Sequence, residues 1–161
     1  MDGYLSREMG NERYGSAERE RAIGNRLHEK RAAMIDRNRV YDFTVIIPCH
    51  NSAGHIMPLL HTLAMQDVTG LKMQYVFVVD SCTDSTDSVL RDHTDMIEWD
   101  KLTIIDCEHG RAGLARNEGL DVALGKYIVF LDSDDNLIRP DFFKLLHMFF
   151  EEYAEADVVL Y

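Results

Sequence analysis

The sequence predicts an α/β fold, with a mostly parallel sheet covered by helices on both faces and preceded by an N-terminal helical segment. Two observations carry this prediction. Short apolar runs alternate with helical patterns along the chain, and the runs are continuously apolar, as in strands buried on both faces. Strands separated by helices form parallel sheets, because each helix returns the chain to the same edge of the sheet. Together these features favour a Rossmann-like arrangement.

Five apolar runs are expected to form the strands. They are rich in β-branched and aromatic residues, which favour extended backbone. The runs are FTVII (43–47), YVFVV (75–79), LTII (102–105), YIVFL (127–131) and DVVLY (157–161).

Helical patterns occupy the segments between these runs. The first contains Pro58, and because the N–H that proline lacks is not needed in a first turn, we expect a loose turn over 53–57 and a helix beginning at Pro58. Further helices are expected near 86–93, from about 113 to 123, and from Pro140 onward.

Residues 1–40 differ in charge from the rest of the chain. They hold nine Lys/Arg and seven Asp/Glu, a net charge of +2, and the whole chain carries −11, which leaves −13 for residues 41–161. A helical pattern from Ser16 to Asp36 has only a thin apolar stripe, so we expect it to pack on the body of the protein or on a second copy of the chain. A partly disordered leader and a membrane-surface helix are the alternatives.

The acidic charge of residues 41–161 argues against nucleic-acid binding, which depends mainly on cations that contact phosphates. An anionic ligand would need a metal ion as intermediary. No apolar run approaches the ~20 residues that cross a bilayer, and the N-terminus lacks the apolar stretch of a secretion signal. We therefore expect a cytoplasmic protein, with the inner face of the membrane as an alternative location. The three cysteines are too widely spaced for a zinc ribbon and are expected to be reduced thiols.

Polar residues follow the first four predicted strands. Ligands bind to open parallel sheets at the carboxyl ends of the strands, near a switch in strand order. The segments at these ends are 48–51, 80–81, 106–107 and 132–135. We therefore expect a binding site along this edge.

Asp132 and Asp134 are the first candidates for that site. Alternate side chains of an extended segment point the same way, so both carboxylates can converge on one point while Ser133 faces away. Two close carboxylates repel unless a cation lies between them, and oxygen ligands suit Mg²⁺ or Mn²⁺. The alternative is a solvated turn that caps the next helix.

Asp80, Arg116 and Asn117 are the next candidates. Asp80 ends a buried strand, and the residues after it are better placed to cap a helix, which leaves its carboxylate to accept hydrogen bonds from a base or ribose. Arg116 and Asn117 can offer a cation and amide donors to a phosphate or base edge. A surface arginine paired with a nearby acid is the alternative for Arg116.

Three stretches of the chain resemble a known family. FTVIIPCHNSAGHIMPLLHTL, VFVVDSCTDSTDSVL and GLARNEGLDVALGKYIVFLDSDD are similar, in order and spacing, to the three signature blocks of family 2 glycosyltransferases, which have the A-type nucleotide-sugar-binding fold. The resemblance covers about residues 42–161 and none of 1–40. It implies the N-terminal donor-binding portion of an enzyme that transfers a sugar from a nucleoside-diphosphate sugar, a UDP-sugar, to an acceptor hydroxyl. It further implies inversion at the transferred carbon and a requirement for Mn²⁺ or Mg²⁺.

The resemblance also assigns roles to single residues. Pro48 and Asn51 match the loop that lies against the nucleoside, and Asp80 matches the acid that contacts the uracil. Arg116 and Asn117 match the positions near the base and diphosphate. In the DxD motif, Asp132 is assigned to the ribose or the metal and Asp134 to the metal.

The second half of the usual catalytic domain, which supplies the acceptor pocket, would begin after the fifth predicted strand. No residue of the chain is assigned as general base, and the acceptor, a saccharide, lipid or protein, is left open. The alternative function is therefore a non-catalytic nucleotide-sugar-binding or assembly module.

Overall fold

The structure is a computed structural model that describes residues 40–97 and 101–156. The helix expected between Ser16 and Asp36 and the fifth expected strand, DVVLY, lie outside the described residues.

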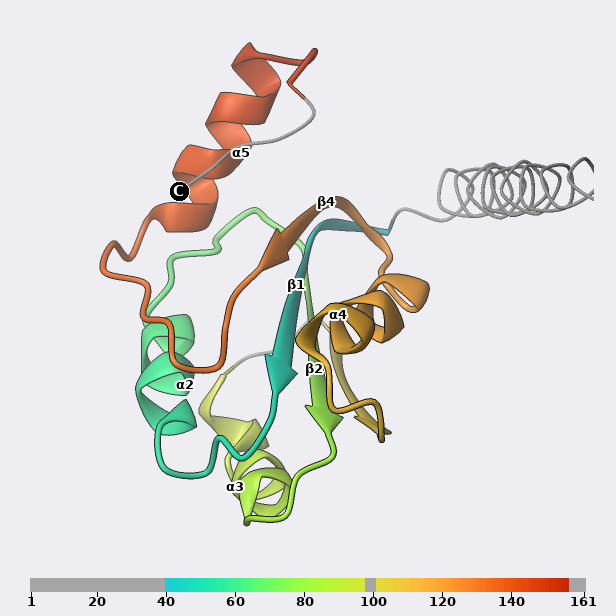
Figure 1. Ribbon diagram of the computed structural model, residues 1–161. Coiled ribbons are helices and arrows are strands. Elements are labelled where there is room, and N and C mark those ends of the chain that lie inside the picture. The colour runs from blue at the N-terminus through green and yellow to red at the C-terminus, as the bar shows by residue number, and fades with distance from the viewer. Residues whose placement is uncertain (1–39, 98–100, 157–161) are drawn as a thin grey trace, which may run out of the picture. The chain divides into compact units, whose positions relative to one another are not determined.

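A four-stranded parallel sheet forms the centre of the described structure (Figure 1). Its strands are β1 (Tyr41–Cys49), β2 (Met73–Asp80), β3 (Lys101–Cys107) and β4 (Gly125–Phe130). They lie in the order β3-β2-β1-β4, so the chain moves outward from β1 to β3 and then returns to the opposite side of β1. The strand order therefore switches between β1 and β4.

Helices cover both faces of the sheet, which confirms the predicted fold class (Figure 1). One face packs against α2 (Ile56–Ala64), α3 (Thr86–Asp92) and α5 (Phe142–Glu152), and a short 3₁₀ helix, η1 (Thr94–Met96), follows α3. The other face packs against α4 (Ala112–Asp121). Since apolar layers lie on both sides, all eight residues of β2 are buried, and this explains its continuously apolar sequence.

The close approach of α4 to β1 depends on Gly119. A Cβ atom at this position would lie 2.4 Å from Cγ2 of Ile46. The hydrogen at Gly119 lets the helix backbone rest directly on the sheet. This contact packs α4 closely against β1.

Two helix starts differ from the sequence-based expectation. The first helix, α2, begins at Ile56 rather than at Pro58, because the carbonyl of Ser52 accepts the N–H groups of both His55 and Ile56 and so continues the turn into the helix. Pro58 is then the third helical residue, where its missing N–H still costs no intrahelical hydrogen bond. The last helix, α5, begins at Phe142 rather than at Pro140.

The last helix is only partly covered by the described residues. Phe143 and Leu146 are buried against the sheet, and the ring of Phe150 stacks on that of Tyr127 at a centroid distance of 4.1 Å. Phe149 lies on the exposed side of the helix. Within the described ranges, no helix combines the length and apolar character needed to cross a bilayer.

Candidate functional site

A cavity of about 330 Å³ opens at the carboxyl edge of the sheet, where the ends of β1 and β4 meet the amino end of α4. Five residues predicted for the site line it: Pro48, Asp80, Arg116, Asp132 and Asp134. The cavity lies at the switch in strand order, as expected for an open parallel sheet, because the connections leaving β1 and β4 diverge there and leave a crevice.

Three residues of the acidic loop, residues 132–135, line this cavity: Asp132, Ser133 and Asp134. Ser133 is buried and its hydroxyl bonds the hydroxyl of Ser52 at 2.8 Å, whereas Asp132 and Asp134 are exposed. The Asp135 carboxylate accepts the N–H of Asp132 at 2.8 Å and closes the turn. The next helix begins only at Phe142, so the loop does not cap a helix.

Arg116 forms an ion pair with Asp132 across the mouth of the cavity. The sequence left open whether Arg116 serves a ligand or pairs with an acid, and the structure shows that it pairs with an acid that itself lines the cavity. No hydrogen bond or ion pair of the Asp134 carboxylate occurs among the described residues. The two acids therefore differ: among the described residues Asp132 has a cationic partner and Asp134 has none.

Asp80 organises the loop between β3 and α4, residues 108–111. Its carboxylate accepts the backbone N–H groups of His109 at 2.6 Å, Gly110 at 2.9 Å and Arg111 at 3.0 Å, and the hydroxyl of Ser81 at 2.9 Å. Gly110 has φ +62°, a conformation that glycine adopts without strain and that lets three successive N–H groups converge on one anion.

These contacts set the charge state of Asp80. Burial opposes its ionisation, but the hydrogen bonds from Gly110, His109, Ser81 and Arg111 outweigh burial and lower its pKa from 3.8 to about 2. The side chain is therefore an anion at neutral pH, with only 2% of the residue exposed.

The carboxylate of Asp80 accepts four hydrogen bonds from the protein, three at one oxygen and one at the other. Asp80 also lines the cavity, and its contact with a base or ribose stays a prediction. By holding the loop, Asp80 places Arg111 on the cavity wall beside Ala112, the first residue of α4.

Sequence reasoning missed two cavity residues, Arg111 and His50. The Nδ1–H of His50 donates to the carbonyl of Asp80 at 2.7 Å, since a carbonyl oxygen can only accept. The Nε2 atom of neutral His50 then carries a lone pair. The only signals in the sequence were the position of His50 directly after a strand and the position of Arg111 directly before a helix.

Asn51 and Asn117 do not line the cavity. The side-chain oxygen of Asn51 accepts the N–H of Thr83 at 2.8 Å and the N–H of Asp84 at 3.3 Å, and its backbone has φ +50°, which asparagine tolerates better than most residues. Asn51 thus ties the loop after β1 to the loop after β2, and its predicted contact with a nucleoside stays a prediction. Asn117 is exposed on α4.

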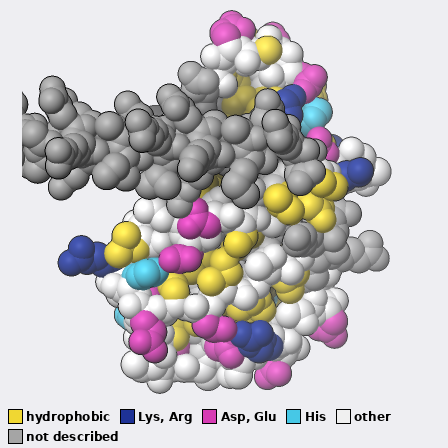
Figure 2. Space-filling model, turned by 90° about the vertical axis from the view of Figure 1, so that its right-hand side faces the viewer, with side chains coloured by type: hydrophobic (Ala, Val, Ile, Leu, Met, Phe, Trp, Pro, Cys, Tyr) yellow, Lys and Arg dark blue, Asp and Glu magenta, His cyan; other side chains and the backbone are white. Residues whose placement is uncertain are grey.

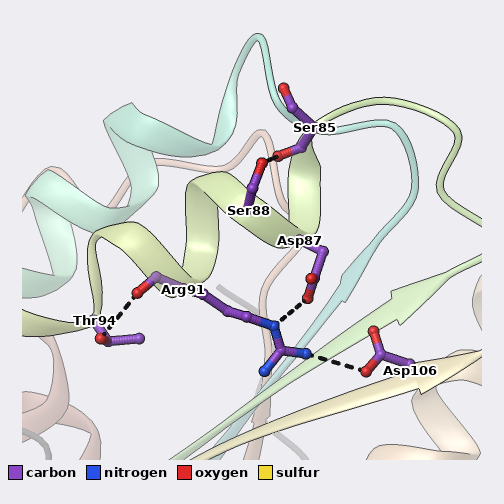
Figure 3. Close-up of polar contacts among 6 residues, drawn as sticks. All are labelled: Ser85, Asp87, Ser88, Arg91, Thr94 and Asp106. Carbon is purple, nitrogen blue, oxygen red and sulfur yellow. Dashed lines mark hydrogen bonds and ion pairs between the residues drawn. The ribbon is translucent and has the colours of Figure 1, made fainter.

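Asp106, at the end of β3, does not line the cavity and points towards Arg91 instead (Figure 3). Its carboxylate pairs with Arg91 of α3 at 3.1 Å, and Arg91 pairs in turn with Asp87 at 2.7 Å. Not every acid at a strand end therefore belongs to the site.

Other acidic side chains are spread over the face of the molecule that α4 covers (Figure 2).

Comparison with known proteins identifies relatives of this chain. The family model described as Glycosyl transferase family 2 matches residues 44–160. The poly(ribitol-phosphate) beta-N-acetylglucosaminyltransferase TarS of Staphylococcus aureus is 33% identical over 118 residues. That alignment covers 73% of this chain and 20% of the relative, so the chain spans about a fifth of the length of TarS.

Two solved structures share the fold. Staphylococcus aureus TarS 1-349 in complex with UDP-GlcNAc has a TM-score of 0.62 and 32% identity, over 70% of this chain and 32% of that one. The mannosyltransferase PcManGT from Pyrobaculum calidifontis, in complex with GDP-Man and Mn²⁺, has a TM-score of 0.54 and 25% identity, over 71% of this chain and 36% of that one.

Proposed function

The chain belongs to glycosyl transferase family 2, and on this premise we propose that it forms the N-terminal donor-binding portion of a sugar-transferring enzyme. The donor is a nucleoside-diphosphate sugar, a UDP-sugar, and the sugar passes with inversion to an acceptor hydroxyl. One observation carries the proposal: a cavity at the switch in strand order brings together two exposed carboxylates and two arginines from separate parts of the chain. The relative TarS, whose solved complexes contain UDP and UDP-GlcNAc, supports the choice of nucleotide.

The diphosphate would lie against the amino end of α4. Backbone N–H groups at a helix start carry partial positive charge and bind anions, and Ala112, the first residue of α4, lines the cavity. Arg111 precedes it, and no hydrogen bond or ion pair of its guanidinium occurs among the described residues. This side chain is therefore able to bind a phosphate oxygen.

A divalent cation would lie between the diphosphate and the acidic loop. Asp132 and Asp134 fit this role because both line the cavity and both are exposed. No group of three or more His, Cys, Asp or Glu side chains in the described ranges is placed to hold a metal ion. The protein would thus supply one or two carboxylates and the ligand the remaining oxygens, the mode typical of Mg²⁺ and Mn²⁺. When bound, the cation supplies Lewis-acid stabilisation of the departing diphosphate.

The nucleoside would occupy the part of the cavity formed by Pro48 and His50. Pro48 offers an apolar surface, and the Nε2 lone pair of His50 can accept a hydrogen bond from an N–H group of the base. Asp80 supports this wall from behind, because its carbonyl holds the His50 ring and its carboxylate holds residues 109–111.

Titration of the protein with UDP in the presence and absence of Mn²⁺, followed by calorimetry, tests the proposal. We expect binding that depends on Mn²⁺ and is lost in Asp134→Asn. The matched control is Asp92→Asn, which removes an equal charge from an exposed position on α3. Binding that does not respond to Mn²⁺, or that survives Asp134→Asn, contradicts the metal role. A wild-type protein that binds no UDP contradicts the whole proposal.

A further inference from the structure

The ion pair between Arg116 and Asp132 engages one of the two acids proposed to hold a metal ion. Asp132 and Asp134 both line the cavity, yet only Asp132 has a cationic partner among the described residues. Arg116 projects from α4, whose amino end faces the same cavity. One arginine thus lies within reach both of an acid assigned to the metal and of the region assigned to the diphosphate.

The pair is well placed to open. The Arg116 side chain is 33% exposed and the Asp132 side chain 56% exposed, so water competes for both charges. An ion pair this solvated shifts an equilibrium by about fivefold or less. A divalent cation attracts a carboxylate oxygen more strongly than a guanidinium does, because it carries twice the charge at a shorter distance. Because both side chains are partly exposed, no buried side chain has to move when the cation binds the Asp132 carboxylate.

We propose that Arg116 is an internal counter-cation on Asp132 in the ligand-free protein, that a divalent cation displaces it, and that the released guanidinium then binds the diphosphate. This exchange rests on the proposed function, because it uses the same cavity and the same anion. It keeps the two acids from repelling each other before the cation arrives.

The exchange couples the two ligands. Cation binding frees the Arg116 guanidinium to donate hydrogen bonds to the diphosphate. Diphosphate binding in turn draws Arg116 away from Asp132, where it competes with the cation. Each ligand must therefore strengthen the binding of the other by the same factor. Arg116 therefore has opposite effects on the two binding steps: it weakens the binding of the cation alone and strengthens the binding of the nucleotide. A residue that only stabilises the fold would not show opposite signs.

Titration with Mn²⁺ in the absence of nucleotide, with free Mn²⁺ followed by electron paramagnetic resonance, tests the first step. We expect Arg116→Gln to bind Mn²⁺ about two- to fivefold tighter than the wild type. The matched control is Arg91→Gln, which removes the same charge but lies on α3, paired with Asp87 and Asp106 outside the cavity (Figure 3). It should bind Mn²⁺ like the wild type. Circular dichroism checks that both variants are folded.

Titration with UDP at saturating Mn²⁺ tests the second step. Arg116→Gln should bind UDP about tenfold more weakly, the usual effect of losing one charge-assisted hydrogen bond.

Several results would overturn the exchange: unchanged or weaker Mn²⁺ binding by Arg116→Gln, equal tightening in Arg91→Gln, or UDP binding by Arg116→Gln as tight as that of the wild type. Absence of Mn²⁺ binding by the wild type and Arg116→Gln alike would overturn it together with the metal role. Tighter Mn²⁺ binding by Arg116→Gln in a protein that binds no UDP would instead refute the proposed function and leave the counter-cation role in place.

Discussion

Replacement of Asp80 by asparagine is the most direct test of how the cavity is built. Asparagine keeps the shape of the side chain but exchanges one acceptor oxygen for an NH₂ group that faces backbone donors. At least one of the N–H groups of residues 109–111 then loses its partner. We therefore expect a lower free energy of unfolding and a loop that no longer places Arg111 on the cavity.

The size of the effect follows from the pKa of Asp80. A carboxyl whose pKa falls from 3.8 to about 2 on folding stabilises the folded protein at neutral pH by about 2 kcal/mol. An unpaired buried donor costs about 1–3 kcal/mol, which is the same range. Because the pKa is lowered on folding, the contribution of Asp80 is complete above its unfolded pKa and is lost as the pH falls towards about 2. The difference between wild type and Asp80→Asn should thus be about 2 kcal/mol at pH 7 and roughly half of that at pH 3.

Urea unfolding followed by circular dichroism at pH 7, 5 and 3 measures this difference. The matched control is Asp106→Asn, at the end of the neighbouring strand, where the side chain is 65% exposed and pairs only with Arg91 among the contacts described. It should change the free energy of unfolding by about 1 kcal/mol or less. Asp80→Asn with the stability of the wild type at pH 7, or with a deficit that stays constant down to pH 3, would refute this account of the loop.

Three further predictions concern the surroundings of the site. Gly119→Ala should lower the free energy of unfolding by about 1–3 kcal/mol in urea titrations, because its Cβ would meet Ile46 at 2.4 Å; a neutral result would show that α4 can shift. Ser133→Ala should cost about 1 kcal/mol by leaving the buried Ser52 hydroxyl without its partner, and adding Ser52→Ala should cost little more; additive losses would contradict the pairing. Cys49 should not react with thiol reagents until the protein unfolds, because burial raises the pKa of its thiol. Mass spectrometry that finds Cys49 labelled in the native protein would contradict this protection.

Much of the architecture was predictable, since it depends on local patterns. Continuous apolar runs between helical patterns predicted the parallel sheet, and the sheet is observed. Alternation along an extended segment was expected to separate Ser133 from Asp132 and Asp134, but residues 132–135 form a hydrogen-bonded turn in which Ser133 is bonded to Ser52. The resemblance to family 2 glycosyltransferases was confirmed by the match over residues 44–160.

The details of the loops were less predictable. Asp80 and Asn51 are predicted to contact a ligand, and that stays a prediction. The sequence did not show that both also bind neighbouring loops, because backbone N–H groups that leave a strand end need acceptors and these side chains are the nearest. Arg111 was not predicted as a cavity residue because its place depends on a contact between distant parts of the chain. Its position depends on hydrogen bonds to a residue that precedes it by 31 positions, and no local pattern reports such a contact.

The sequence by itself determined which residues form strands, which edge of the sheet carries polar chemistry, and which family the chain resembles. These properties follow from the spacing of apolar residues and from short motifs, and both depend only on residues that are close together in the sequence. Only the tertiary structure decided which polar residues face the cavity and which bind the protein itself. Asp132 lines the cavity and pairs with Arg116, Asp106 pairs with Arg91, and Asp80 lines the cavity while its carboxylate holds residues 109–111. The physical reason is competition among partners: a carboxylate binds the nearest donors, and only folding decides which donors are nearest.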